Sequence, residues 1–444
     1  GVGPATAGQV PAAPTPLAGR PPTDDGFVPM PGGTARDVAV RLDSADGGPL
    51  VTVSGPDAPV WAGLAPSPAL GGVPDAPPRS FTGADGIEPF VLIGFSWAGP
   101  VDVPARFRVH TAAGWGAWWP LTRGTDHGPD VGSPEQPPVP ATGDVTATDP
   151  DRVAPGSVAT DPVWVGPADG WQLGLDGDAT AVRVHLVRTV PGGAGSDGGA
   201  GPTGGGDPGD PFARQRTGAA GAAPLPAIGP WSGIVSSPAL TGSRPTERPA
   251  ILSRADWSAA PPTNPIWAAT SLRLAIVHHT VSSNTYSPDD VPVMLRSIQA
   301  YHMTTNGWDD LGYNFIVDRF GRIWEGRSGS VDSLSIGAQA SGVNTGSFGT
   351  ALLGDFRTEA PTPEALDALE RLLAWKLFRH GADPGRTGTI LPRVTELYPA
   401  YTPVTLARII GHRDVNATEC PGQKLWDLLP AVRADVQTRW SAMA

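Results

Sequence analysis

The sequence predicts two folded parts: an all-β domain of the sandwich type over residues 27–190, and an α/β domain with a mixed central sheet flanked by helices over 250–444. Three observations carry this prediction. Short strands separated by turn residues, with no helical pattern, fill 27–190. A Gly/Pro-rich stretch over 191–249 has the composition of a flexible linker. Strand and helix patterns then alternate to the end of the sequence, as in α/β folds.

Composition narrows the classes of protein that fit. Gly (58) and Pro (52) make up about a quarter of the 444 residues, which favours linkers and turns. Residues 1–26 are rich in Pro, Ala and Gly, with too little apolar surface to offset the entropy of ordering, so we predict a disordered segment. The net charge of −12 and the lack of a basic stripe argue against nucleic acid as a partner. No apolar run approaches the ~20 residues of a membrane span.

The start of the chain and its residue usage bear on where the protein works. The sequence begins at Gly1 without methionine, and we interpret it as an exported protein whose signal has been removed. Cys420 is the single cysteine, so an intramolecular disulfide is excluded. Nearly all positive charge is arginine, which together with the Ala/Gly/Pro excess fits a GC-rich bacterial genome. We therefore expect a secreted or cell-envelope protein of bacterial origin.

Alternating or continuous apolar runs predict the strands of the β domain. They lie at residues 37–42, 50–53, 90–97, 105–110, 114–119, 162–165 and 181–187. Three aromatic residues of the fifth run, Trp115, Trp118 and Trp119, fit either a sugar-stacking platform or, as the simpler alternative, aromatic core packing.

The elements of the α/β domain follow from apolar runs and helix-capping residues. Strands are expected at 272–277 and 350–354, and a hairpin at 313–317 with 322–325. Ser287 is expected to cap a helix with Pro288 at its first position. Thr362 precedes a second helix that ends at Gly381, and a last helix runs from about residue 423 to 440.

Two segments far apart in the sequence carry metal-binding residue types. Cys420 lies eight positions after His412. His278 and His279 directly follow the predicted strand at 272–277. Two histidines and a thiolate can bind one zinc ion and leave a fourth position open, as catalytic zinc sites require. Two unrelated histidines and a buried thiol are the alternative. Adjacent strand residues face opposite sides, so His279 is not expected to join His278 on the metal.

Further motifs occur in the same order as in a known family, and residues 249–444 closely resemble the peptidoglycan recognition proteins. That family is part of the zinc-dependent N-acetylmuramoyl-L-alanine amidase superfamily, which also includes the phage amidase lysozymes. The resemblance rests on residues 277–280, 301–303, 307–315, 324–327, 344–347 and 411–422. Each motif alone is weak, whereas all of them in order are highly specific.

The resemblance implies a catalytic site with one Zn²⁺ per chain. The family's zinc ligands fall on His278, His412 and Cys420, its catalytic tyrosine on Tyr313, and a threonine facing the metal-bound water on Thr418. Zinc activates water and polarises the scissile carbonyl, and a tyrosine hydroxyl can donate to the developing oxyanion. A threonine is no strong base, so we expect Thr418 to position water. The proton acceptor stays open between Glu325 and the metal's own water.

The resemblance also implies a substrate groove. Contacts with the substrate are expected from Thr280, His302 and Asn344. The pair Gly307-Trp308 matches members that prefer meso-diaminopimelate stems, and Arg327 would then bind the extra carboxylate. A surface arginine on the hairpin is the alternative for Arg327. Gln339 stands where animal members often have histidine, which puts contacts on that side of the groove in doubt.

The activity implied is hydrolysis of the amide between N-acetylmuramic acid and L-alanine in peptidoglycan, with meso-diaminopimelate-type stems. The alternative is a non-catalytic peptidoglycan-binding receptor or cell-wall scaffold. The expected partners are peptidoglycan and muropeptides, and the β domain would bind a cell-wall polymer or a protein.

Overall fold

The computed structural model describes residues 15–16, 34–39, 82–98, 104–121, 124, 127–130, 133, 135, 158–175, 180–188, 248–393 and 395–444. The described residues up to 188 and from 248 onward belong to one compact unit. Residues 191–247 of the predicted linker lie outside the described residues. The predicted strand at 50–53 lies outside them as well. Of the predicted disordered segment 1–26, only β1 (Thr15–Pro16) is described, and it pairs antiparallel with β13 (Trp267–Ala268).

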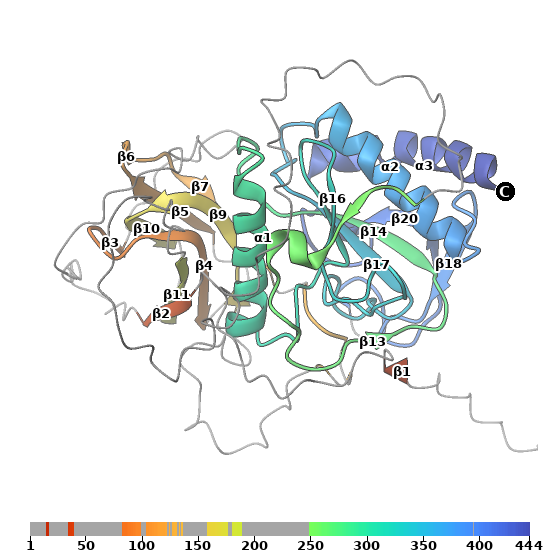
Figure 1. Cartoon of the computed structure of the whole chain (residues 1–444). Helices are drawn as coiled ribbons and strands as arrows, with labels where there is room; N and C mark the ends of the chain where they lie inside the picture. Colours follow the sequence, from red (N-terminus) through yellow and green to blue (C-terminus); the bar gives the residue numbers. More distant parts are fainter. Residues whose placement is uncertain are drawn as a thin grey trace, which may run out of the picture. The chain divides into compact units, whose positions relative to one another are not determined.

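A six-stranded mixed sheet organises the C-terminal part (Figure 1), in the order β12-β16-β15-β17-β14-β20. Its strands are β12 (Ile251–Leu252), β14 (Leu274–His279), β15 (Phe315–Val317), β16 (Ile323–Glu325), β17 (Ser347–Leu352) and β20 (Ile409–Gly411). The strands β15, β17, β14 and β20 run parallel, and β16 is antiparallel to β15. The predicted mixed central sheet is confirmed. A two-stranded sheet of β18 (Thr387–Ile390) and β19 (Val404–Ala407) is separate from it.

Helices cover both faces of this sheet. The helices α2 (Pro363–Arg379) and α3 (Gln423–Met443) share one core with Phe315 and Val317. The helix α1 (Asp290–Ala300) packs with Ile316 on the opposite face, as expected from the alternation of side chains along a strand. Among the described residues, no helix is both long and apolar enough to cross a bilayer.

The capping residues predicted from the sequence are confirmed for α2 but not for the start of α1. The Thr362 hydroxyl accepts the N–H of Ala365 at 3.2 Å, and Gly381 past the helix end has a φ of 62°. The prediction that Ser287 caps α1 with Pro288 at its first position is wrong. Both the N–H and the hydroxyl of Ser287 donate to the Asp290 carboxylate at 2.8 Å, so these residues form a turn ahead of a helix that begins at Asp290.

The described strands from β2 to β11 form two antiparallel sheets. One contains β3 (Thr82–Ala84), β10 (Gly170–Leu175), β5 (Ala105–Thr111), β6 (Gly114–Trp115) and β7 (Trp119–Pro120). The other contains β2 (Thr34–Ala39), β11 (Thr180–Arg188), β4 (Phe90–Ala98), β8 (Val158–Ala159) and β9 (Val163–Ala168). Phe95 of one sheet contacts Trp171 of the other in a shared core, with ring centroids 6.0 Å apart. A β-sandwich over the full range 27–190 stays a prediction.

The strand β10 was not predicted, and the role of the tryptophans at 115–119 was left open. The strand β10 escaped prediction because Gly170 and Gly174 interrupt its apolar pattern, although β5 pairs with it along its whole length. Trp119 packs in the core, as the simpler alternative held. The Arg108 guanidinium lies over the rings of Trp115 and Trp118, at 5.1 and 4.8 Å from their centroids.

N-terminal strands also contribute to the core around α1. Val91, Leu92, Trp164 and Val187 pack in the same cluster as the buried side chains of that helix. Nearby, the Tyr301 hydroxyl donates to the carbonyl of Thr160 at 3.4 Å. These residues lie on β4, β9 and β11, so one sheet of the N-terminal part packs against α1.

One buried carboxylate holds the turn that follows α1. The Asp310 side chain is fully buried and forms an ion pair with Arg254 at 2.9 Å. It also accepts N–H groups from Gln299 at 2.7 Å, from Leu311 at 2.8 Å and from Ser328 at 2.9 Å. This carboxylate therefore joins α1, the segment ahead of it and the hairpin.

We expect Asp310→Asn to lower the free energy of unfolding by about 3–5 kcal/mol, because it leaves the Arg254 charge without its buried partner. The measurement is urea unfolding followed by tryptophan fluorescence. The control is Asp332→Asn, whose side chain is exposed and whose change is expected to stay within about 0.5 kcal/mol. Equal stability of the two variants would contradict this role of Asp310.

Candidate metal centre

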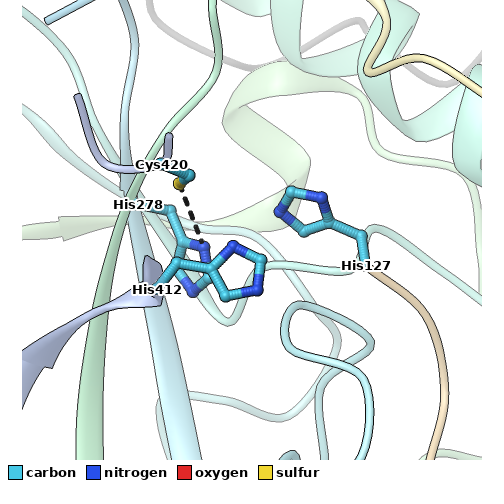
Figure 2. Close-up of side chains that lie close together, drawn as sticks. All are labelled: His127, His278, His412 and Cys420. Atoms are coloured by element: carbon cyan, nitrogen blue, oxygen red, sulfur yellow. Dashed lines mark hydrogen bonds between the residues drawn. The ribbon is translucent and has the colours of Figure 1, made fainter. Parts of the chain in front are cut away.

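The predicted metal ligands come from neighbouring elements of the central sheet. His278 lies near the end of β14, and His412 follows β20 directly. These strands are parallel neighbours, so both histidines lie at the same edge of the sheet. Cys420 lies in the loop before α3. All three are buried, at 0%, 0% and 2% exposure, and Figure 2 shows their side chains together.

The separation of the donor atoms fits a metal ion. The Cys420 Sγ lies 3.6 Å from the His278 Nδ1. Ligands at the usual Zn–S and Zn–N distances and a tetrahedral angle would lie about 3.6 Å apart. The rings of His278 and His412 have centroids 4.5 Å apart, and the donor atoms of the whole group lie within 4.8 Å of one another. The chemistry of the donor set and the spacing of Cys420 and His278 therefore fit a zinc ion.

The surroundings of His278 favour the neutral imidazole, which is the form that binds metal. Burial, followed by the neighbouring imidazoles of His412 and His127, lowers the pKa of His278 well below its usual value. A neutral imidazole is the form that coordinates a metal. The backbone N–H of His279 donates to the Cys420 sulfur at 3.4 Å and helps to hold it at the site. The His279 ring lies elsewhere, where its Nδ1 accepts the N–H of Phe356 at 3.3 Å, so the expectation that it stays off the metal agrees with the structure.

Gln339 orients the His278 ring. Its Oε1 hydrogen-bonds to the His278 Nε2, and its Nε2 donates to the Ser347 hydroxyl at 3.0 Å. The amide oxygen thus acts as the acceptor, which makes His278 Nε2 the donor and leaves the Nδ1 lone pair facing Cys420. Gly349 leaves room for this side chain, because a Cβ there would lie 2.5 Å from the Gln339 Cγ. The sequence marked Gln339 only as a departure from the family pattern.

We expect Gln339→Ala to weaken zinc binding by about 10–100-fold, because the ring of His278 loses the acceptor that holds it. The measurement is competition for zinc against a chelating dye. Gln339→Glu keeps an acceptor at this position and is the matched comparison, expected to bind zinc more tightly than Gln339→Ala. Unchanged affinity of Gln339→Ala would show that His278 needs no such support.

A fourth donor comes from the N-terminal part of the chain. His127 completes the group of possible metal-binding residues with His278, His412 and Cys420 (Figure 2). Its ring centroid lies 4.6 Å from that of His412, and its Nδ1 lies 3.1 Å from the Asp161 carboxylate. Sequence reasoning missed His127, because a histidine in a Gly/Pro-rich stretch belongs to no motif.

The other predicted catalytic residues lie around this group. The Tyr313 ring centroid is 5.4 Å from that of His278, and its hydroxyl is 3.4 Å from His127 Nε2. The Thr418 hydroxyl accepts the N–H of Cys420 at 3.2 Å, so it shapes the cysteine loop. Glu325 accepts the N–H of Val331 at 3.3 Å and interacts electrostatically with Lys376, which points to a place in the hairpin rather than at the metal centre.

Two of the predicted substrate-binding residues, His302 and Trp308, place their rings next to Tyr313, and a third, Gly307, lies in the turn beside them. Gly307 has a φ of 70°, which favours glycine at the turn. The rings of His302 and Trp308 are tilted by 40° with centroids 4.5 Å apart, and the His302 ring centroid lies 5.8 Å from that of Tyr313. The His302 Nδ1 accepts the N–H of Gly312 at 3.1 Å, and burial lowers the pKa of His302 well below its usual value. A neutral His302 therefore presents an uncharged ring.

The three remaining substrate-binding candidates are polar and buried. The Thr280 hydroxyl accepts the N–H of Gly354 at 3.1 Å and is engaged within the fold. The alternative of a surface position for Arg327 is wrong, because this residue is 1% exposed. Its Nη2 pairs with the Glu135 carboxylate. The Asn344 side-chain amide donates to the Asp130 carboxylate at 2.9 Å.

Comparison with known proteins gives a consistent result for this part of the chain. A family model described as N-acetylmuramoyl-L-alanine amidase matches residues 268–423. Peptidoglycan-recognition protein LB of Drosophila melanogaster is 34% identical over 177 residues, which cover 40% of this chain and 66% of that protein. Peptidoglycan-recognition protein SC2 of Drosophila simulans is 31% identical over 177 residues, covering 40% and 83%.

Two solved structures align with a similar share of the chain. Wild-type Drosophila PGRP-LB aligns with 32% identity and a TM-score of 0.33, covering 41% of this chain and 93% of that one. The endolysin N-acetylmuramoyl-L-alanine amidase LysCS from Clostridium intestinale URNW aligns with 21% identity and a TM-score of 0.31, covering 43% and 97%.

Proposed function

The chain belongs to the peptidoglycan recognition protein family within the N-acetylmuramoyl-L-alanine amidases, and we propose that it is an active zinc amidase. It would hydrolyse the amide between N-acetylmuramic acid and L-alanine in peptidoglycan. The observation that carries the proposal is the donor set of His278, His412 and Cys420, complete and at the spacing of a shared tetrahedral ion, with Tyr313 beside it.

The residues of the chain have distinct tasks in this proposal. His278, His412 and Cys420 would hold the zinc, which when bound supplies an activated water and a Lewis acid for the scissile carbonyl. The Tyr313 hydroxyl donates a hydrogen bond to the oxyanion as it develops. Thr418 holds the backbone at Cys420 and keeps the thiolate in place. Glu325 is engaged by Val331, so we assign it no proton transfer.

We further propose that the stems are of the meso-diaminopimelate type. Arg327 is buried and already pairs with a carboxylate, that of Glu135, so its guanidinium can bind the extra carboxylate of such a stem. The Gly307-Trp308 pair agrees with this preference. Peptidoglycan lies outside the cytoplasmic membrane, so the activity requires export, which we propose as well.

The rival is a receptor or scaffold that binds peptidoglycan without cleaving it. It is disfavoured because receptors of this family have lost a zinc ligand, often the cysteine, whereas Cys420 is present here and placed 3.6 Å from His278.

The test is mass spectrometry of diaminopimelate-type and lysine-type peptidoglycan after digestion by the full chain, with and without chelator. It includes the triple variant His127→Ala, Asp130→Asn, Glu135→Gln, which removes the N-terminal contacts with the groove. Stem peptides with free alanine amino termini are expected, with a preference for the diaminopimelate type and loss of activity after chelation. If neither the wild type nor the triple variant releases stem peptides when loaded with zinc, the amidase is refuted. Binding of muropeptide without turnover would establish the receptor.

A further inference from the structure

Three side chains of the N-terminal part, His127, Asp130 and Glu135, contact the proposed metal centre and the substrate groove. We call these three residues the internal ligand. They come from a short stretch of the chain, yet each one contacts a different group that the amidase reaction would need.

His127 has the environment of a metal ligand. Its side chain is 6% exposed, and its Nδ1 lies 3.1 Å from an Asp161 oxygen. Metal-binding histidines commonly have a carboxylate beside the ring nitrogen that does not bind the ion. The other nitrogen, Nε2, lies 3.4 Å from the Tyr313 hydroxyl, and the donor atoms of the group lie within 4.8 Å of one another. A catalytic zinc keeps a fourth position for water, and beside a zinc held by His278, His412 and Cys420 it is His127 that would take that position.

Asp130 is bound by the loop that carries Asn344. Its carboxylate is 1% exposed and accepts the N–H groups of Asn344 at 3.0 Å and Thr345 at 2.9 Å. It also accepts from the Asn344 amide at 2.9 Å and the Thr345 hydroxyl at 2.7 Å. The neighbouring Gly128 carbonyl accepts from the Asn344 amide at 2.8 Å. Four donors on one carboxylate form a complete anion site, and Asn344 has no side-chain donor left for a substrate.

Glu135 is bound in the same way by the other end of the groove. Its side chain is 9% exposed and pairs with the Arg327 Nη2. Its second carboxylate oxygen accepts the N–H of Asp309 at 3.0 Å. Arg327 is the residue to which we assign the extra carboxylate of the stem, so Glu135 occupies the position of that carboxylate.

We propose that the internal ligand holds the protein in a latent state, with His127 as the fourth metal ligand and Asp130 and Glu135 in place of the anionic groups of the stem peptide. The inference rests on the proposed amidase function. Because the internal ligand is part of the chain, its effective concentration is high, on the order of millimolar or more. Muropeptide must displace it, so the apparent affinity falls by the fraction of open protein. Release of the N-terminal part from the groove would activate the enzyme.

The structure offers matched controls for these contacts. His110 also pairs with a carboxylate, that of Asp169 at 2.6 Å, but at a half-buried position of β5. Glu88 pairs with Arg188 at 3.4 Å away from the groove. His110→Ala and Glu88→Gln therefore remove the same chemical groups from the same part of the chain without touching the groove.

The first experiment measures zinc affinity by competition with a chelating dye, using the full chain. His127→Ala is expected to bind zinc at least about tenfold more weakly than the wild type. The loss of a direct ligand should cost at least as much affinity as the loss of a residue that only orients a ligand. His110→Ala is expected to bind like the wild type. Unchanged affinity of His127→Ala would overturn the role of His127 as a ligand.

The second experiment measures binding of a soluble diaminopimelate-type muropeptide by calorimetry, and its cleavage by mass spectrometry. The double variant Asp130→Asn, Glu135→Gln is expected to bind about tenfold or more tightly than the wild type. The triple variant with His127→Ala is expected to cleave faster than the wild type by a similar factor when zinc is saturating. Glu88→Gln is expected to behave like the wild type.

The outcomes separate this inference from the proposed function. Equal muropeptide affinity of the wild type and the double variant would overturn the latent state. Slower cleavage by His127→Ala at unchanged zinc affinity would also overturn it, and would instead make His127 and Asp161 an acid–base pair. Tighter binding by the triple variant without any cleavage would support the internal ligand and refute the amidase.

Discussion

Cys420→Ser is expected to weaken zinc binding by about 10²–10³-fold. A neutral hydroxyl is a far poorer zinc ligand than a thiolate. Structural zinc sites gain roughly 10–16 kcal/mol from about four ligands, so one ligand corresponds to about 3 kcal/mol, which is two to three powers of ten in affinity. The measurement is competition against a chelating dye, with zinc content after dialysis as a second readout.

The fold is expected to survive this substitution, because sulfur and oxygen differ little in size and the surrounding loop is held by other contacts. The Thr418 hydroxyl still accepts the N–H of residue 420, and the Arg413 N–H still donates to its carbonyl at 2.8 Å. Thr418→Ser keeps the hydroxyl and is the control, expected to bind zinc like the wild type. A Cys420→Ser protein that retains one zinc per chain after dialysis would show that the thiolate is no ligand.

Tyr313→Phe is expected to lower turnover by about 10²–10³-fold while zinc and muropeptide stay bound. The substitution removes only the hydroxyl that would donate to the oxyanion, and the loss of one such donor has this typical cost. The comparison is made in the background of the triple variant, so that the internal ligand affects neither protein. Zinc content, muropeptide affinity and cleavage rate are measured on the same preparations.

Tyr286→Phe provides the matched control for this experiment. Tyr286 is a second buried tyrosine whose hydroxyl donates to the carbonyl of Leu353 at 3.2 Å and accepts the N–H of Arg319 at 2.8 Å. Its removal is expected to lower stability by about 1–3 kcal/mol and to leave turnover unchanged. If Tyr313→Phe keeps at least about a third of the turnover, Tyr313 only lines the groove and the mechanism loses its oxyanion donor.

Local chemistry explains what could be read from the sequence in the C-terminal part. The apolar runs that end at His278 and at Leu352 form neighbouring parallel strands, and Thr362 caps α2 as expected. Such patterns depend on residues close together in the chain, where alternation and capping act directly. The metal-binding residue types were visible for the same reason, since a histidine and the single cysteine lie eight positions apart.

The mixed central sheet, the second and third helices of the α/β domain and the residue types that can hold zinc were all predictable from local sequence patterns. The contacts of His127, Asp130 and Glu135 with the groove, and the support of His278 by Gln339, became visible only in the folded chain. These contacts join residues far apart in the chain, and no periodicity or spacing encodes them. They arise because β4, β9 and β11 pack against α1 in a shared core and so fix the N-terminal part against the sheet that carries the metal centre.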